Sequence, residues 1–76
     1  MENTIHGITK AQAHKAIARI IESQGYDFDK AFDIFESPEN PGCVDCAFNF
    51  VNHSDRLEGA VMTLWINNTG NLVGEW

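Results

Sequence analysis

Hydrophobic residues in the first third of the chain recur at spacings of three and four, as they do along one face of an α-helix. The positions on this face are Ala13, Ile17, Ile20, Ile21 and Gln24, with Ala16 at its edge. Thr9 and Gln12 have the spacing of a capping box, in which each side chain accepts a backbone N–H of the other residue. Gly25 can take the left-handed conformation that ends many helices. The pattern therefore predicts a helix over residues 9–24.

The next segment, YDFDKAFDIFES at residues 26–37, fits two patterns. Between Phe28 and Phe35 the apolar residues have helical spacing, whereas between Tyr26 and Ile34 apolar and polar residues also alternate as in a strand. With Phe32 among the inward positions, the alternation favours a strand at about 31–36. The segment is short and rich in aromatic residues, and the turn-forming PENPG follows it at 38–42. We expect a strand, and the helical interpretation stays open.

The remaining residues alternate with a period of two, which is typical of half-buried strands. The inward positions are Val44, Cys46, Phe48 and Phe50 on one strand and Ala60, Met62, Leu64 and Ile66 on the next. A polar loop, 52–59, separates these strands, and NNTGN at 67–71 predicts a tight hairpin leading to a last strand at 72–76. We predict an α+β fold with one N-terminal helix packed on one face of a three- to four-stranded antiparallel sheet. Residues 1–76 would form a single domain.

Composition restricts the class of protein further. A chain of 76 residues that is 43% apolar can form one modest core. No run of about 18 apolar residues is present, so we expect no membrane segment. The first ten residues lack the pattern of a secretory signal, and two cysteines are too few for a disulfide scaffold. These features predict a cytoplasmic protein with free thiols.

The formal net charge of −6 is distributed unevenly along the chain. Residues 1–25 carry three cations and two acids, a balance of +1, whereas residues 26–76 carry two cations and nine acids, a balance of −7. A nucleic-acid backbone would be repelled by this second part, because binding it requires clustered Lys and Arg. We therefore expect no direct nucleic-acid binding. The acidity either serves binding to a basic partner or only keeps the protein in solution.

Cys43 and Cys46 have the CxxC spacing of zinc and redox sites, and His53 follows them. In an extended strand, residues three apart point to opposite faces, so the two sulfurs could not share a metal ion. A structural zinc site needs four ligands, and thioredoxin-type chemistry needs a helix after the cysteines. We expect no metal and no cofactor. A zinc or thiol module built on a tight knuckle at Pro41 and Gly42 remains the alternative.

Catalytic motifs are not apparent. His53, Ser54 and Asp55 are neighbours in the sequence, but a catalytic triad is defined by its geometry in space, so turn formation is the simpler interpretation. A sheet with one helix also offers no walls for a deep substrate pocket. We predict that the protein is not an enzyme.

One helix covers one face of a sheet, so the other face should be free to bind a partner. An aromatic anchor surrounded by charged residues is typical of protein-binding surfaces. The candidate partner-binding residues on or beside this face are Trp65, Asp45, Asp33, Glu75, Val61 and Val51. A solvated face without function and a homodimer through this face are the other interpretations.

These observations predict a small acidic protein-interaction module whose partner is a larger protein or complex with a basic surface. In size and acidity the chain is similar to phage- or mobile-element-encoded inhibitors of nucleic-acid-binding host defence complexes, namely anti-CRISPR and anti-restriction proteins. That similarity implies an inhibitor that acts as a DNA mimic. The alternatives are the zinc or thiol module that uses Cys43, Cys46 and a histidine, and a self-associating accessory protein with no inhibitory role.

Overall fold

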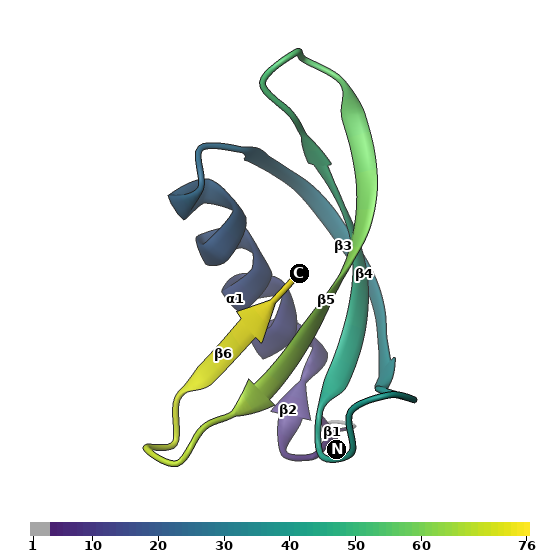
Figure 1. Cartoon of the computed structure of the whole chain (residues 1–76), viewed down its shortest axis with the longest axis vertical. Helices are drawn as coiled ribbons and strands as arrows, with labels where there is room; N and C mark the ends of the chain where they lie inside the picture. Colours follow the sequence, from purple (N-terminus) through teal and green to yellow (C-terminus); the bar gives the residue numbers. More distant parts are fainter. Residues whose placement is uncertain (1–3) are drawn as a thin grey trace.

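The computed structural model describes residues 4–76 and contains one helix and two antiparallel sheets, which confirms the α+β class (Figure 1). The elements are β1 (Thr4–Ile5), β2 (Ile8–Thr9), α1 (Lys10–Ser23), β3 (Asp27–Glu36), β4 (Val44–Val51), β5 (Leu57–Ile66) and β6 (Leu72–Glu75). β1 and β2 form a small hairpin, and β3 to β6 form a four-stranded sheet in chain order. The larger sheet therefore lies within the predicted range of three to four strands.

Both ends of α1 are closed by local hydrogen bonds. At the start, the Gln12 amide donates to Thr9 Oγ1 at 3.1 Å and the Thr9 amide donates to Gln12 Oε1 at 2.9 Å. At the end, Gly25 has φ +86° and the Tyr26 amide donates to the Ile21 carbonyl at 3.2 Å. This arrangement is a Schellman motif, and it turns the chain out of the helix toward β3.

β3 is a strand over its whole length, so the helical interpretation of residues 26–37 is wrong, and the strand is longer than the predicted 31–36. Its pairing with β4 has two irregularities, between Phe28 and Lys30 and between Ala31 and Ile34. Each of these bulges adds a residue to β3 that has no separate partner on β4. Phe28, Ala31 and Ile34 consequently face the core at intervals of three. This spacing explains why the segment has a helical pattern in the sequence.

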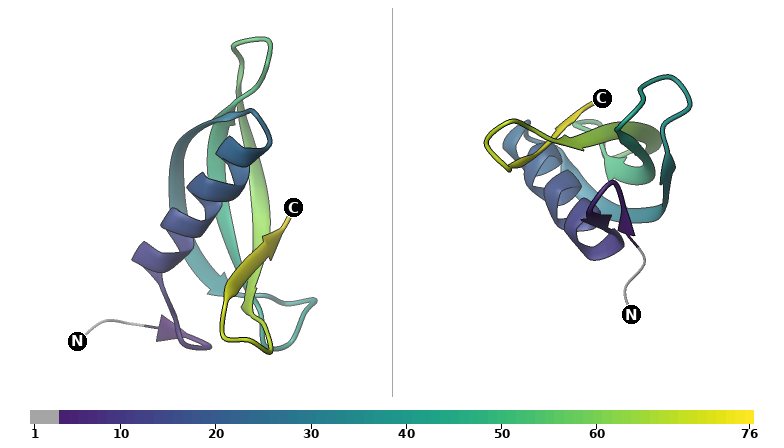
Figure 2. Two further views of the ribbon diagram at one scale, coloured as in Figure 1. Left: turned by 90° about the vertical axis from the view of Figure 1, so that its left-hand side faces the viewer. Right: turned by 90° about the horizontal axis from the view of Figure 1, so that it is seen from below.

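α1 lies against one face of the larger sheet (Figure 2). Four helix residues share a single hydrophobic core with side chains from β2, β4 and β5. The core residues are Ile8, Ala13, Ala16, Ile17, Ile21, Val44, Cys46, Phe48, Phe50, Met62 and Leu64. On β4, buried and half-buried residues alternate without interruption, as the sequence predicts.

The connection between β4 and β5 is shorter than the predicted loop at 52–59, because β5 already begins at Leu57. Asn52 closes this turn: its Oδ1 accepts the Ser54 amide at 2.8 Å and the Arg56 amide at 3.1 Å. Asp55 adopts a positive φ of 59° within it. A side-chain turn of this type allows the two strands to pair immediately on either side.

The hairpin of β1 and β2 is an element that the sequence analysis did not predict. Its turn is formed by His6 and Gly7, both with positive φ (52° and 78°), which is the conformation of a type I′ turn. The hairpin places Ile8, which is 1% exposed, in the core. It therefore adds a fully buried residue to the core before the helix begins.

The C-terminal residues close the opposite end of the core. Trp76 packs edge-on against Tyr26, Phe48 and Phe50, with ring centroids 5.1 to 5.8 Å apart. Its Nε1 donates to Gln24 Oε1 at 3.1 Å, which connects the C-terminus to the end of α1. Trp76 remains 42% exposed, so one side of the indole is also part of the surface.

Candidate protein-binding face

The side of the β3–β6 sheet opposite α1 is here named the open face, because no element between residues 4 and 76 covers it (Figure 2). The strand registers place one row of side chains across all four strands of this face. The row consists of Phe35, Asp45, Thr63 and Glu75. The open face therefore presents an aromatic ring, two carboxylates and a hydroxyl group side by side.

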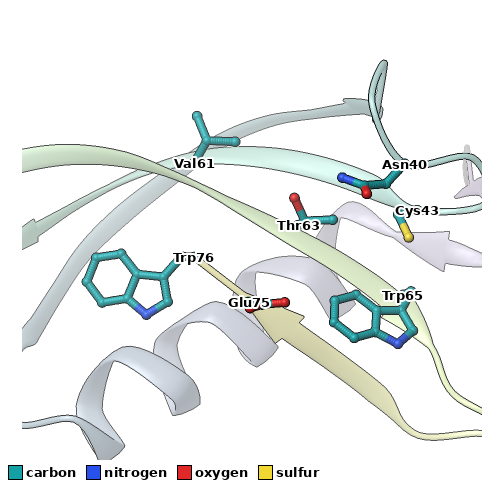
Figure 3. A pocket seen from close by; sticks show the side chains of 7 residues that line it. All are labelled: Asn40, Cys43, Val61, Thr63, Trp65, Glu75 and Trp76. Atoms are coloured by element: carbon teal, nitrogen blue, oxygen red, sulfur yellow. The ribbon is translucent and has the colours of Figure 1, made fainter.

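An open hollow of about 580 Å³ lies at the β6 side of this face (Figure 3). It is lined by Asn40, Cys43, Val61, Thr63, Trp65, Glu75 and Trp76. Cys43 and Trp65 lie at one end and Trp76 at the other. The hollow brings together Val61, Trp65 and Glu75, three of the residues that the sequence analysis selected as partner-binding.

Asp45 is connected to this hollow through a hydrogen bond. Thr63 Oγ1 donates to Asp45 Oδ1 at 2.8 Å across the β4–β5 pair, and Thr63 lines the hollow. Because both residues are half-buried, the carboxylate has a restricted orientation. Asp45 is thus held beside Trp65 and Glu75 rather than free to rotate in solvent.

The other two selected residues lie away from the hollow. Val51 is at the far end of β4, opposite Leu57 of β5. Asp33 accepts a 2.8 Å hydrogen bond from Lys10 Nζ in the first turn of α1, so its carboxylate is turned toward the helix. This bond lowers the pKa of Asp33 and raises that of Lys10. The structure therefore separates Asp33 from the acidic group formed by Asp45 and Glu75.

Two aromatic side chains of β3 are exposed, and for Phe32 the sequence analysis did not expect this. Phe32 is 41% exposed, although the alternation placed it among the inward residues, and Phe35 is 45% exposed. The bulges are the reason: the residue added between Phe28 and Lys30 places Ala31 on the core side opposite Phe48, so the next residue, Phe32, faces outward. Lys30 Nζ lies 5.4 Å from the centroid of the Phe32 ring, in the range of a cation–π contact. No sequence signal marks this position, since the bulge depends on the pairing with β4.

Contacts from the helix side hold the second bulge of β3, between Ala31 and Ile34, in place. His14 Nε2 donates to the Phe32 carbonyl oxygen at 2.9 Å, next to the Lys10–Asp33 pair. The Cys46 thiol also lies 3.9 Å from this carbonyl. Helix and sheet thus cooperate to orient the exposed aromatic residues of β3.

The two cysteines point to opposite sides of the sheet. Cys46 is fully buried in the core, where burial raises the pKa of its thiol, whereas Cys43 lines the hollow on the open face. His53, the nearest histidine in the sequence, stacks on Tyr26 with ring centroids 4.7 Å apart. In the region from Thr4 to Trp76, no three His, Cys, Asp or Glu side chains are grouped so that they could hold a metal ion. The geometry required by a zinc or thiol module built on this pair is therefore not present.

The loop with His53, Ser54 and Asp55 is a turn stabilised by hydrogen bonds to Asn52. The Ser54 amide donates to Asn52 Oδ1, and the Asp55 amide donates to the Asn52 carbonyl at 3.0 Å. His53 is directed toward Tyr26 rather than toward Ser54. These residues form and pack the turn between β4 and β5.

No family model, curated protein or solved structure matches this chain. Across the described part of the chain, no helix is long and apolar enough to span a membrane. The open face is therefore the feature of the molecule from which a function can be inferred.

Proposed function

We propose that this chain is a small acidic protein-interaction module that binds a larger partner through the open face of its sheet. The observation that carries this proposal is the combination of exposed apolar groups and oriented carboxylates on one surface. Phe35 and Val61 are 45% and 50% exposed, and Asp45 and Glu75 lie in the same row of the sheet as Phe35. Aromatic and aliphatic anchors with charged surroundings are typical of the centre and rim of protein interfaces.

The partner that fits this face has a basic surface. The net charge is −6, and residues 26–76, which contain all four strands of the larger sheet, have a balance of −7. Opposite charges accelerate the encounter of two proteins and select partners with the complementary sign. Basic protein surfaces in turn are commonly the sites at which nucleic acids bind.

The specific function that we propose is inhibition of a nucleic-acid-binding complex, in the manner of anti-CRISPR or anti-restriction proteins from phages and other mobile elements. The acidic face would occupy the surface that the partner uses for DNA or RNA. The size and acidity of the chain support this proposal. An inhibitor of this type acts by steric and electrostatic exclusion and needs no chemistry of its own.

An affinity pull-down followed by intact-mass measurement of the complex identifies the partner and its stoichiometry. The decisive measurement is then a competition between this chain and the nucleic acid that the isolated partner binds. We expect the two to exclude each other, and we expect Lys15→Ala on the outer face of α1 to compete as well as the parent. A ternary complex that holds both the chain and the nucleic acid would contradict the inhibitory mechanism, and a partner without a basic surface would contradict the binding mode.

A further inference from the structure

The hollow on the open face places a carboxylate next to an indole. Glu75 of β6 pairs with Thr63, two residues before Trp65 on β5. Trp65 and Glu75 are therefore diagonal neighbours on the same face of the sheet, a separation that long and aromatic side chains can bridge. Both residues line the hollow, and Figure 3 shows Glu75 between the indoles of Trp65 and Trp76.

The negative charge in the hollow is not balanced by cations of the described chain. Both ion pairs found within residues 4–76 join the N-terminal part of the chain to β3, the edge strand on the other side of the sheet from β6. Over the same residues, no Lys, Arg or His side chain lines the hollow. Asp45 adds a second carboxylate beside it through the hydrogen bond with Thr63. A cationic group from another molecule would therefore meet unopposed negative charge here.

The walls of the hollow are held in position by contacts within the chain. The Trp76 indole packs edge-on against Phe48 and Phe50 and donates a hydrogen bond to Gln24 Oε1. Trp65 lies in the paired part of β5, where β6 fixes its backbone. A ligand that enters the hollow therefore has little of the protein left to order, which favours binding.

A guanidinium group fits this surface better than an ammonium group. It is planar, so it can stack on an indole while its N–H groups donate two parallel hydrogen bonds to a carboxylate. Trp is the aromatic side chain that attracts cations most strongly. A Lys ammonium is a compact, strongly hydrated charge that cannot make both contacts at once. The chemistry of the hollow thus corresponds to an Arg side chain.

We propose that the hollow is a binding site for an Arg side chain of the partner, whose guanidinium group pairs with Glu75 and stacks on Trp65. The assignment rests on the proposed function, because it names the group by which the basic partner is recognised. Arg is also a side chain with which proteins contact nucleic-acid phosphates. An Arg held in this hollow is withdrawn from the nucleic acid.

An NMR titration of the isotope-labelled full chain with Nα-acetyl-arginine amide tests the site without the partner. NaCl is adjusted so that the ionic strength stays constant. We expect saturable shifts of the Trp65 indole N–H and the Glu75 amide, with a dissociation constant on the order of 10 mM. Nα-acetyl-citrulline amide has nearly the same shape without the charge and should give no saturable shift. Nα-acetyl-lysine amide should bind about threefold more weakly or worse.

Two substitutions separate the carboxylate from the indole. Glu75→Gln keeps the size of the exposed side chain and should raise the dissociation constant of the arginine probe about tenfold. Asp29→Asn is the matched control, because it removes one negative charge from an exposed residue of β3 at the other edge of the sheet, and it should bind like the parent. Trp65→Leu removes the π system and should weaken binding several-fold, as reported by the Glu75 amide.

Three outcomes would overturn the proposal. They are an arginine probe that gives no saturable shift up to about 100 mM, a citrulline or lysine probe that binds as tightly, and an equal loss in Asp29→Asn and Glu75→Gln. If the titration fails while the chain still competes with nucleic acid for the partner, only the arginine site is wrong. If the titration succeeds but the partner has no basic surface, the proposed function is wrong and the site remains.

Discussion

Thr63 Oγ1 holds Asp45 Oδ1 at 2.8 Å across β4 and β5, on the face of the sheet opposite the helix. The bond connects Asp45, in the row of side chains that crosses the open face, to the hollow that Trp65 lines. A carboxylate with a restricted orientation contributes directed charge to a binding surface, whereas a freely rotating one contributes mainly to the overall field. The open face therefore has a defined polar part and an apolar part next to each other.

Substitutions in the polar part and in the apolar part of the open face should change different rate constants of partner binding. Asp45→Lys and Glu75→Lys should each slow association with the partner, because they weaken the long-range attraction. Trp65→Ala should instead accelerate dissociation, since it removes an apolar contact without changing the charge. Asp33→Lys should have a smaller effect, because Asp33 is engaged with Lys10 on the helix side.

Rates measured by biolayer interferometry at several salt concentrations check this prediction. Lys15→Ala, on the exposed side of α1, serves as the control and should leave both rate constants unchanged. Binding that survives about 0.5 M salt and all three charge reversals would show that electrostatic attraction does not direct the encounter.

The two thiols should differ strongly in reactivity. Cys43 is half-buried at the hollow, whereas Cys46 is fully buried and burial raises the pKa of its thiol, so less of the reactive thiolate is present. Iodoacetamide under native conditions should label Cys43 first, as followed by intact-mass spectrometry. Cys43→Ser should remove this fast phase, and Cys46→Ser should leave it intact. Equally fast labelling of both thiols would mean that the inward and outward positions of β4 are assigned to the wrong faces.

Gly74 should be required for the close packing of β6 against the side chains of Leu64, Met62 and Ile20. A Cβ atom at this position would lie 2.6 Å from Leu64 Cδ2, 2.8 Å from Met62 Sδ and 3.1 Å from Ile20 Cδ1. Gly74→Ala should therefore lower the free energy of unfolding by about 1–3 kcal/mol, which urea denaturation can measure. Gly59→Ala is the control, since its nearest neighbour is the mobile end of the Asn49 side chain at 3.3 Å. A Gly74 variant as stable as the control would mean that these side chains can shift to admit a methyl group without cost.

Neighbouring isoleucines of the helix should contribute unequally to stability. Ile17 is fully buried between α1 and the sheet, whereas Ile20 is only partly buried beside β6. Ile17→Ala should cost about 2–5 kcal/mol, a large share of the stability of a domain this small. Ile20→Ala should cost less, because part of its side chain already contacts water. Thermal denaturation of the two variants gives the comparison, and a larger loss for Ile20→Ala would place the helix in a different rotation.

The Lys10–Asp33 pair should have a measurable pH signature. The hydrogen bond from Lys10 lowers the pKa of Asp33 below its ordinary value of 3.8, so the folded state favours the charged carboxylate. Its contribution to stability is therefore present above pH 3.8 and is lost as the pH falls through the lower pKa of the folded state. Lys10→Ala should raise the pKa of Asp33, as measured by NMR titration, while Lys15→Ala should not. An unchanged pKa in the Lys10 variant would mean that the pair does not form in solution.

The ends of the helix could be predicted from the sequence because they depend on residues close together in the chain. Thr9 and Gln12 cap one another, and Gly25 permits the turn that lets Tyr26 bond to Ile21. The alternation of β4 is equally local, and it identified Cys46 as a core residue and Cys43 as an outward one. Neither result required knowledge of which strands are neighbours.

The exposure of Phe32 on β3 could not be identified from local pattern alone. The bulges between Phe28 and Lys30 and between Ala31 and Ile34 exist only in the pairing with β4, and they shift Phe32 from the inward to the outward side. The same holds for Asp33, which depends on the position of Lys10 at the start of α1. An alternating pattern assumes a regular strand, so one bulge inverts the faces that it assigns and a second bulge restores them.

The sequence by itself determined the α+β class, the capped helix and the phase of β4, because short-range hydrogen bonds and the period of the side chains specify them. The tertiary structure decided which acidic and apolar residues share a surface. It brought Trp65, Glu75 and Thr63, the hydrogen-bond partner of Asp45, to one hollow and moved Asp33 to the helix side. The physical reason is that strand register and the length of β6 are set by pairing between distant segments, and a surface is defined only once that pairing is complete.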